Sequence, residues 1–258
     1  MSQLSELYGL RIGCVRYLNS RPLIHAYPGK VIFDHPSKLA SMLASGELDL
    51  ALIPIYEVIR TPEYRVVDQV AIASLGPVYS VFLAYTGELS AVTRIERDPA
   101  SMTSVNLLQV LLAEFHGIRA ELHDPNGANG SPLISQARLL IGNQAIDFRK
   151  VHGDQFQYLD LGAEWTLQTG LPFVFAAWAL RPGLSAGVAE AIRSLKAASM
   201  AQLEEIIAGE EDPEFARDYL THKIRFDLGA PEKQAIARFA GLLAKHGLSK
   251  KSPGLTYV

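Results

Sequence analysis

The sequence predicts an α/β protein of two lobes with a ligand cleft between them. Apolar strand patterns alternate with amphipathic helix patterns along the first part of the chain. The nearly continuous apolar run Leu48–Ile55 is typical of a strand buried on both faces, as in parallel sheets covered by helices. A second α/β unit begins near Val92, and the apolar stretch Pro172–Leu180 is interpreted as the strand that carries the chain back. Since the remainder of the chain is helical, we expect C-terminal helices to complete a discontinuous first lobe.

The expected first lobe comprises residues 1–87 and 176–258, and the expected second lobe comprises residues 88–175. The chain is expected to cross between them near Tyr85–Ser90 and again near Pro172–Leu180. This arrangement places a ligand where strand ends and helix N-termini face one another.

The elements before residue 90 follow from local patterns. Ser37 is expected to cap the helix Lys38–Ser45, which Gly46 ends. Gly76 and Pro77 separate the last two strands of this part. The other predicted elements are strands at Leu10–Tyr17, Val31–Asp34, Leu48–Ile55, Val66–Leu75 and Val78–Tyr85, and helices at Arg21–Ala26 and Tyr56–Arg60.

Beyond residue 90, Asp98-Pro99 ends the strand Val92–Arg97, and Ser101–Ser104 opens the amphipathic helix Val105–Phe115. Further predictions are strands at Glu121–His123 and Ala137–Ile141, a loop at Asn126–Pro132, and helices at Leu161–Gly170, Ser185–Gly209, Pro213–Arg225 and Pro231–His246.

Composition excludes several classes of protein. A net charge of −3 over 258 residues gives no basic field for nucleic acid or an acidic membrane. The single cysteine, Cys14, excludes an internal disulfide and is expected to be an inert buried thiol. We expect no signal peptide and no membrane span, and therefore a cytoplasmic protein. The histidines lack metal-ligand spacing, so no metal site is expected.

Three places along the chain are candidate anion sites. A strand runs directly into Asn19-Ser20-Arg21, and Pro22 then opens a helix, which leaves free amides and a positive dipole end beside Asn19 and Ser20. An ordinary N-cap would explain the same residues. The second place is the start of the helix after residue 100, where the hydroxyls of Ser101, Thr103 and Ser104 exceed what one cap requires. The third is Gly142-Asn143, where glycine permits close backbone approach and asparagine offers a donor and an acceptor.

Ser80 lies within a strand pattern near the first crossing. It is interpreted either as a satisfied core hydroxyl or as a cleft residue, and both alternatives stay open. Trp165 and Trp178 are expected to pack in the core. The familiar catalytic signatures, such as Gly-x-Ser-x-Gly, the P-loop and His-Glu-x-x-His, do not occur.

Several motifs, taken together and in order, resemble the chorismate dehydratase family of the futalosine route to menaquinone. The motifs span almost the whole chain: Tyr17–Leu23, Gly46–Pro54, Gly76–Ser80, Thr103–Val105, Leu140–Ala145, Asp160–Trp165, Thr169–Phe173 and Ile224–Gly229. The resemblance implies a fold like that of type II periplasmic binding proteins, and dehydration of chorismate to 3-[(1-carboxyvinyl)oxy]benzoate without a metal or organic cofactor.

The resemblance also implies residue roles. Asn19 and Ser80 match the family's catalytic-site residues. Chorismate, a small dicarboxylate, is expected to bind through Ser20, Ser101, Thr103, Ser104, Gly142 and Asn143. The chain departs from the family where Met102 replaces a frequent arginine and Asn143 replaces a frequent aspartate.

Two other functions stay open at this point. One is the related synthesis of 1,4-dihydroxy-6-naphthoate, against which the Tyr17–Pro22 motif argues. The other is a binding or sensor protein that closes on a small carboxylate without turnover, because lobe closure leaves the same sequence pattern.

Overall fold

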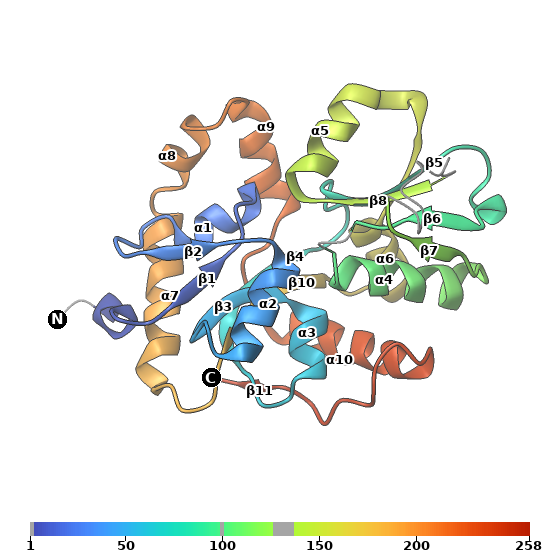
Figure 1. Ribbon diagram of the computed structural model, residues 1–258. Helices are drawn as coiled ribbons and strands as arrows, with labels where there is room; N and C mark the ends of the chain where they lie inside the picture. The colour runs from blue at the N-terminus through green and yellow to red at the C-terminus, as the bar shows by residue number, and fades with distance from the viewer. Residues whose placement is uncertain (1–2, 99–100, 126–136) are drawn as a thin grey trace.

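Two mixed β-sheets organise the computed structural model, which describes residues 3–98, 101–125 and 137–258. Each sheet has its own helices, and the two halves lie side by side (Figure 1). We call the six-stranded sheet with its helices lobe 1 and the five-stranded sheet with its helices lobe 2. The loop predicted at Asn126–Pro132, and Pro99 of the predicted strand break, lie outside the described residues.

The sheet of lobe 1 has the strand order β11-β4-β10-β3-β1-β2. Strand β1 pairs in parallel with both neighbours, whereas β10 runs antiparallel between β3 and β4, with Leu180 opposite Leu50. All residues of β3 are buried, as its apolar run predicts. The strands are β1 (Ile12–Cys14), β2 (Val31–Phe33), β3 (Leu50–Pro54), β4 (Arg65–Ser74), β10 (Phe173–Leu180) and β11 (Thr256–Tyr257), the last of which the sequence did not predict.

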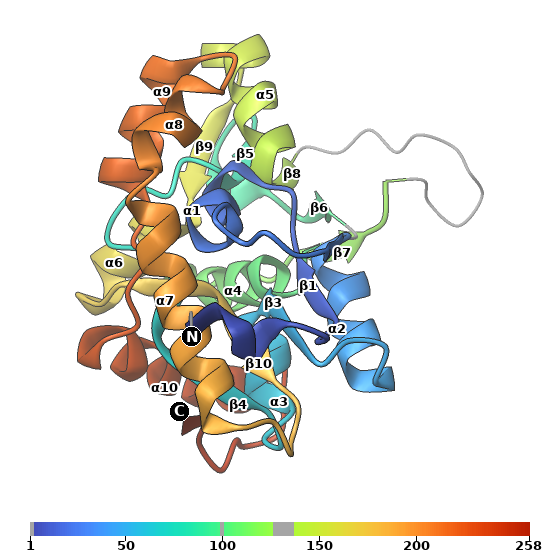
Figure 2. The same cartoon turned by 90° about the vertical axis from the view of Figure 1, so that its left-hand side faces the viewer.

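Helices cover this sheet from two sides, with α7 on one side and α2 and α3 on the other (Figures 1 and 2). The helices are α1 (Arg21–Ile24), α2 (Pro36–Ser45), α3 (Ile55–Arg60), α7 (Ala186–Met200), α8 (Leu203–Ala208), α9 (Pro213–Asp218) and α10 (Ala230–Lys245). Short turns of other helix types lie at Gln3–Leu7, Leu18–Ser20 and Tyr219–Lys223, the last a π-helical turn.

The ends of α2 show what local pattern can predict. The helix ends at Gly46, whose φ of 83° is the left-handed conformation that glycine adopts without strain. The predicted cap at Ser37 was wrong, because α2 begins two residues earlier than predicted, at Pro36, and His35 occupies the cap position. Proline suits the first helical turn, where its missing N–H loses no bond.

The sheet of lobe 2 has the strand order β7-β6-β8-β5-β9. Its strands are β5 (Val81–Tyr85), β6 (Arg94–Glu96), β7 (Glu121–His123), β8 (Ala137–Ile141) and β9 (Gln157–Asp160). Its helices are α4 (Thr103–Leu111), which continues into a π-helical turn at Leu112–His116, then α5 (Gly142–His152) and α6 (Leu161–Thr169), with short 3₁₀ turns at Leu89–Ala91 and Gly153–Gln155. The sequence did not predict α5 or β9.

The chain crosses between the sheets earlier than the expected boundary at residue 87. Strand β5 pairs antiparallel with β8 and β9 and so belongs to the second sheet, although the sequence placed it in the first lobe. The crossing segment is therefore 75–80, between β4 and β5, and the chain returns at 170–172, before β10. This moves Ser80 from the strand interior, where it was predicted, to the end of a crossing segment.

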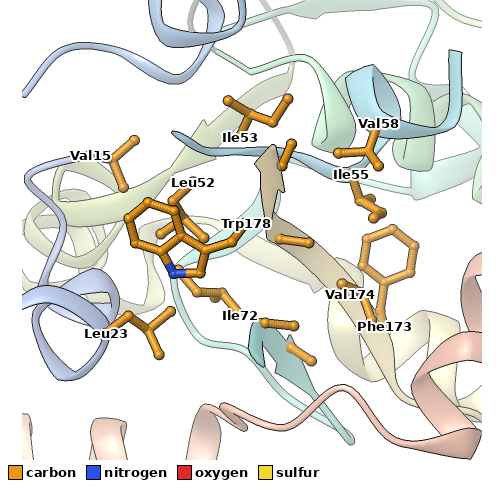
Figure 3. Close-up of a cluster of buried hydrophobic side chains, with 14 of the residues drawn as sticks. Val15, Leu23, Leu52, Ile53, Ile55, Val58, Ile72, Phe173, Val174 and Trp178 are labelled. Carbon is orange, nitrogen blue, oxygen red and sulfur yellow. The ribbon is translucent and has the colours of Figure 1, made fainter. Parts of the chain in front are cut away.

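The hydrophobic core of lobe 1 centres on its sheet. Figure 3 shows the indole of Trp178 among Val15, Leu23, Leu52 and Ile72. Trp178 and Trp165 are fully buried, and Trp165 packs edge-on against Phe173 at 5.2 Å between ring centroids. The prediction that both tryptophans are packing residues is confirmed. In the described part of the chain, no helix combines the length and the apolar character that crossing a bilayer requires.

Replacing Trp178 with alanine removes the largest side chain from this cluster. We expect Trp178→Ala to lower the free energy of unfolding by about 3–5 kcal/mol in urea denaturation, because a cavity remains where the indole packed. The matched control is Leu167→Ala, since Leu167 is 77% exposed and its loss should change stability by less than about 0.5 kcal/mol. Equal losses in the two variants would contradict the packing described for the sheet.

The cysteine gives a second test of the core. Cys14 is fully buried, and burial raises the pKa of its thiol to about 12, so the reactive thiolate is scarce at neutral pH. We expect a chromogenic disulfide reagent at pH 8 to leave the folded protein unmodified for many minutes and to label one thiol rapidly in denaturant. Rapid labelling of the folded protein would show that β1 is open to solvent.

Candidate functional site

A cavity of about 620 Å³, part of it open to solvent, lies between the two lobes. Both sheets supply its walls, and the carboxyl ends of β1, β3 and β8 lead into it. The lining residues are Val15, Tyr17, Asn19, Pro36, Leu52, Ile53, Pro54, Ile72, Val78, Ser80, Val81, Ser101, Met102, Thr103, Ser104, Ile141, Gly142, Phe175 and Ala176.

Every residue of this lining is neutral. The walls are mostly apolar, and the polar groups are hydroxyls and one amide. Such a lining concentrates its specificity in a few polar groups. Any charged ligand must therefore be stabilised by dipoles and hydrogen-bond donors, because the lining contains no opposite charge.

Helix N-termini supply part of that stabilisation. Three helices begin at the cavity: α2 at Pro36, α4 at Thr103 and α5 at Gly142. The N-terminal end of each helix carries partial positive charge from aligned peptide dipoles and from backbone N–H groups without helical partners. Because three helices begin at one neutral cavity, the cavity favours an anion even though its lining contains no cation.

The amide of Asn19 and the hydroxyl of Ser80 meet at a common partner, Tyr219. Asn19 Nδ2 donates to Tyr219 Oη at 3.1 Å, and Ser80 Oγ lies 2.7 Å from the same oxygen. Tyr219 is buried, and burial raises the pKa of its phenol to about 12, so it stays protonated at neutral pH. Asn19 Oδ1 is buried and has no hydrogen-bond partner among the described residues.

The backbone that presents Ser80 is held by a carboxylate. Asp160 accepts hydrogen bonds from the backbone N–H groups of Val78 at 3.0 Å and Tyr79 at 2.7 Å, and it also caps α6 through Ala163 at 3.0 Å. Burial raises the pKa of Asp160, and these three bonds oppose that rise. Tyr79 has a φ of 68°, a conformation that costs energy for any residue other than glycine.

At the start of α4, none of the predicted hydroxyls caps the helix. Met102 occupies the cap position without a side-chain hydrogen bond. Thr103 Oγ1 instead accepts from the backbone N–H of Tyr56, at the start of α3, at 3.1 Å. Ser101 Oγ is buried without a partner among the described residues, and Ser104 also lines the cavity. The hydroxyl of Ser101 is therefore available to form a hydrogen bond with a ligand in the cavity.

The lobes touch directly beside the cavity. Gly142 has a φ of 63°, and a Cβ at this position would lie 2.8 Å from Cε1 of Tyr17. The neighbouring Asn143 Oδ1 accepts from the backbone N–H of Leu18 at 3.3 Å. Burial, together with the nearby carboxylate of Asp98, raises the pKa of Tyr17 to about 12. Gly142 and Asn143 therefore join the lobes.

Most of the site residues expected from the sequence converge on the cavity, namely Asn19, Ser80, Ser101, Thr103, Ser104 and Gly142. Ser20 and Asn143 do not line it. Ser20 Oγ donates to the backbone oxygens of Val15 at 2.7 Å and Tyr17 at 2.8 Å, so it shapes the turn after β1.

Sequence reasoning missed Tyr17, Tyr219 and Asp160. Tyr17 and Asp160 lie inside motifs that the sequence analysis identified, but the motifs did not predict which residues they contact. No pattern in the sequence pointed to Tyr219.

Known proteins resemble this chain in sequence along most of its length. A family model described as menaquinone biosynthesis matches residues 10–245. Chorismate dehydratase of Thermus thermophilus is 31% identical to this chain in an alignment of 261 positions. The alignment covers 90% of this chain and 94% of that protein.

Solved structures share the fold. A protein from Archaeoglobus fulgidus superposes with a TM-score of 0.71 at 18% identity, covering 93% of this chain and 98% of its own. A Candida albicans protein, described as having the generic periplasmic binding protein structural fold, gives a TM-score of 0.62 at 13% identity, with 94% and 91% covered. The predicted two-lobe, periplasmic-binding-protein-like α/β fold is therefore confirmed.

The Tyr17 contact at Gly142 can be tested by comparing glycines. Gly142→Ala and Gly170→Ala both place a side chain at positive φ, with φ values of 63° and 71°, but nothing lies within 4 Å of a Cβ at Gly170. We expect Gly170→Ala to lower the free energy of unfolding by about 1–2 kcal/mol through backbone strain. Gly142→Ala should cost more, because its Cβ also meets the Tyr17 ring.

Chemical denaturation measures both variants. Adding Tyr17→Ala should recover the excess cost at Gly142 and leave the cost at Gly170 unchanged. If both glycine variants lose the same stability, and Tyr17→Ala recovers nothing, the lobes are not in contact at this point in solution.

Proposed function

The chain belongs to the menaquinone biosynthesis family, and we propose that it is the enzyme of that pathway that eliminates water from chorismate to give 3-[(1-carboxyvinyl)oxy]benzoate. Family membership confirms the resemblance drawn from the sequence motifs. The observation that carries the proposal is the neutral cavity between the lobes, in which Asn19 and Ser80 share one buried partner and three helices begin.

Binding of a dicarboxylate suits this cavity. Burying a carboxylate without a counter-charge is costly unless donors surround it. The start of α4 offers backbone N–H groups, the positive end of the helix dipole and the unpartnered hydroxyl of Ser101. The starts of α2 and α5 supply further positive potential on other sides of the cavity. We assign one substrate carboxylate to α4, with Ser101, Thr103 and Ser104 around it.

The reaction is an elimination that needs little acid–base chemistry from the protein. A C–H bond and a C–O bond of the ring break, the C–H electrons enter the ring π system, and the proton and hydroxide leave as water. Because the product is aromatic, the driving force lies in the substrate. The enzyme must orient the ring, assist departure of hydroxide and exclude water.

The cavity lining contains no histidine, aspartate or glutamate among the described residues. We therefore assign the role of proton acceptor to a carboxylate of the substrate itself. Asn19 and Ser80 are assigned to the departing hydroxyl, since both line the cavity and both contact Tyr219. Preorganised donors aimed at developing charge contribute strongly in a site shielded from water.

Turnover of chorismate tests the proposal directly. Purified protein incubated with chorismate should form an aromatic product, which is followed by ultraviolet absorbance and identified by chromatography. Ser80→Ala and Asn19→Ala should each lower kcat by about 100-fold, because each removes one positioned hydrogen-bonding group. Ser45→Ala, which changes an exposed serine at the far end of α2, is the matched control and should keep wild-type kcat.

Two outcomes would contradict the proposal. Thermal stabilisation by chorismate without any product would indicate a binding protein that closes without turnover. Near-wild-type rates in both Ser80→Ala and Asn19→Ala would show that the reacting groups lie elsewhere.

A further inference from the structure

Tyr219 reaches the site from a distant part of the chain. It lies in the π-helical turn that follows α9 and is 1% exposed. It does not line the cavity, yet its hydroxyl contacts both Asn19, from the turn after β1, and Ser80, from the crossing segment. One phenol thus joins the two residues that carry the proposed chemistry.

Counting protons assigns the direction of these hydrogen bonds. Tyr219 Oη accepts a hydrogen bond from Asn19 Nδ2 and carries one proton of its own. If Ser80 also donated to Oη, the phenol proton would be left in a buried place that no ligand reaches. If Tyr219 donates to Ser80 Oγ, the unpaired proton is that of Ser80, which lines the cavity. Since unpaired buried donors are costly, the second arrangement is favoured once a ligand accepts from Ser80.

The donors and acceptors of Asn19 are assigned in the same way. With Nδ2 donating to Tyr219, the amide cannot rotate freely, and Oδ1 is left buried without a partner among the described residues. Tyr219 therefore leaves one free donor on Ser80 and one free acceptor on Asn19. A hydroxyl group of a bound molecule can satisfy both, because it accepts one hydrogen bond and donates another.

Contacts from both lobes and from the crossing segment fix the position of Tyr219. Its ring stacks on Phe215 of α9, with 5.6 Å between centroids and an interplanar angle of 14°. Phe215 packs against Tyr79 at 5.2 Å, and Lys150 of α5 donates to Asp212 at 2.8 Å. Figures 1 and 2 show α9 beside α5. These contacts hold the phenol where the lobes meet.

We propose that Tyr219 is a positioning residue that orients the Ser80 hydroxyl as donor and the Asn19 Oδ1 as acceptor toward the departing hydroxyl group of the substrate. The inference rests on the proposed function, because it assigns both groups to the same substrate hydroxyl. It goes beyond that function by placing the control of their orientation outside the cavity.

Steady-state kinetics of Tyr219→Phe test the proposal. The variant keeps the ring and its stacking on Phe215 but loses the hydroxyl. We expect kcat for chorismate to fall at least tenfold while KM stays within twofold, because the substrate carboxylates keep their contacts. The double variant Tyr219→Phe/Ser80→Ala should be slower than Ser80→Ala by less than the single-variant factor of Tyr219→Phe, since part of the effect of Tyr219 passes through Ser80 and the rest through Asn19.

The matched control is Tyr27→Phe. Tyr27 also loses one phenol hydrogen bond, to the backbone oxygen of Leu7 at 3.1 Å, but lies outside the cavity lining. It should keep wild-type kcat. If Tyr219→Phe does not fold, 3-fluorotyrosine at position 219 preserves the shape and strengthens the phenol as a donor. It should then change kcat at least twofold without changing KM.

The outcomes separate this inference from the proposed function. Wild-type protein that binds chorismate without converting it overturns both. Wild-type turnover together with an unchanged kcat in Tyr219→Phe overturns the inference alone. The inference also fails if Tyr219→Phe raises KM by the same factor by which it lowers kcat. It fails as well if Tyr219→Phe slows the Ser80→Ala variant by the full factor by which it slows the wild type, because Tyr219 would then act independently of Ser80.

Discussion

The site depends on the backbone of the crossing segment, which Asp160 holds by accepting hydrogen bonds from the N–H groups of Val78 and Tyr79. They hold the crossing segment in a conformation that Tyr79 would not adopt freely, with a φ of 68°. That conformation puts Ser80 at the cavity wall and turns the Tyr79 ring onto Phe215, which in turn stacks on Tyr219. Because the same carboxylate caps α6, this helix, the crossing segment and the cavity wall at Ser80 form one connected unit.

Neutrality is the second organising property of the site. A cavity without charged side chains avoids the cost of burying a cation when no ligand is present. Helix N-termini provide permanent positive potential at no such cost, since their N–H groups need partners in any case. Met102 fits this design, because it lies at the cap position of α4 and contributes an uncharged side chain to the lining.

Local patterns predicted much of the fold and fewer of its contacts. The apolar run at β3 and the glycine at the end of α2 each specify their structure within a few residues, so both were predicted. Strand β5 was assigned to the wrong lobe because an apolar strand pattern does not reveal which neighbour it pairs with. Helix α5 has mixed apolar and polar residues after Gly142-Asn143, which were interpreted only as a binding turn. Tyr219 was missed because its contacts lie 200 and 139 residues away in sequence.

The architecture suits the proposed elimination, whose product is aromatic. Such a reaction needs no strong base from the protein, and a base in the cavity would bring a charge that competes with the substrate carboxylates. Hydroxyl and amide groups have the opposite advantage, since each presents a donor or an acceptor according to its partner. Their weakness is freedom of rotation, and a fully buried partner such as Tyr219 removes that freedom. The free-energy cost of orienting Ser80 and Asn19 is thus met when the chain folds, before any substrate binds.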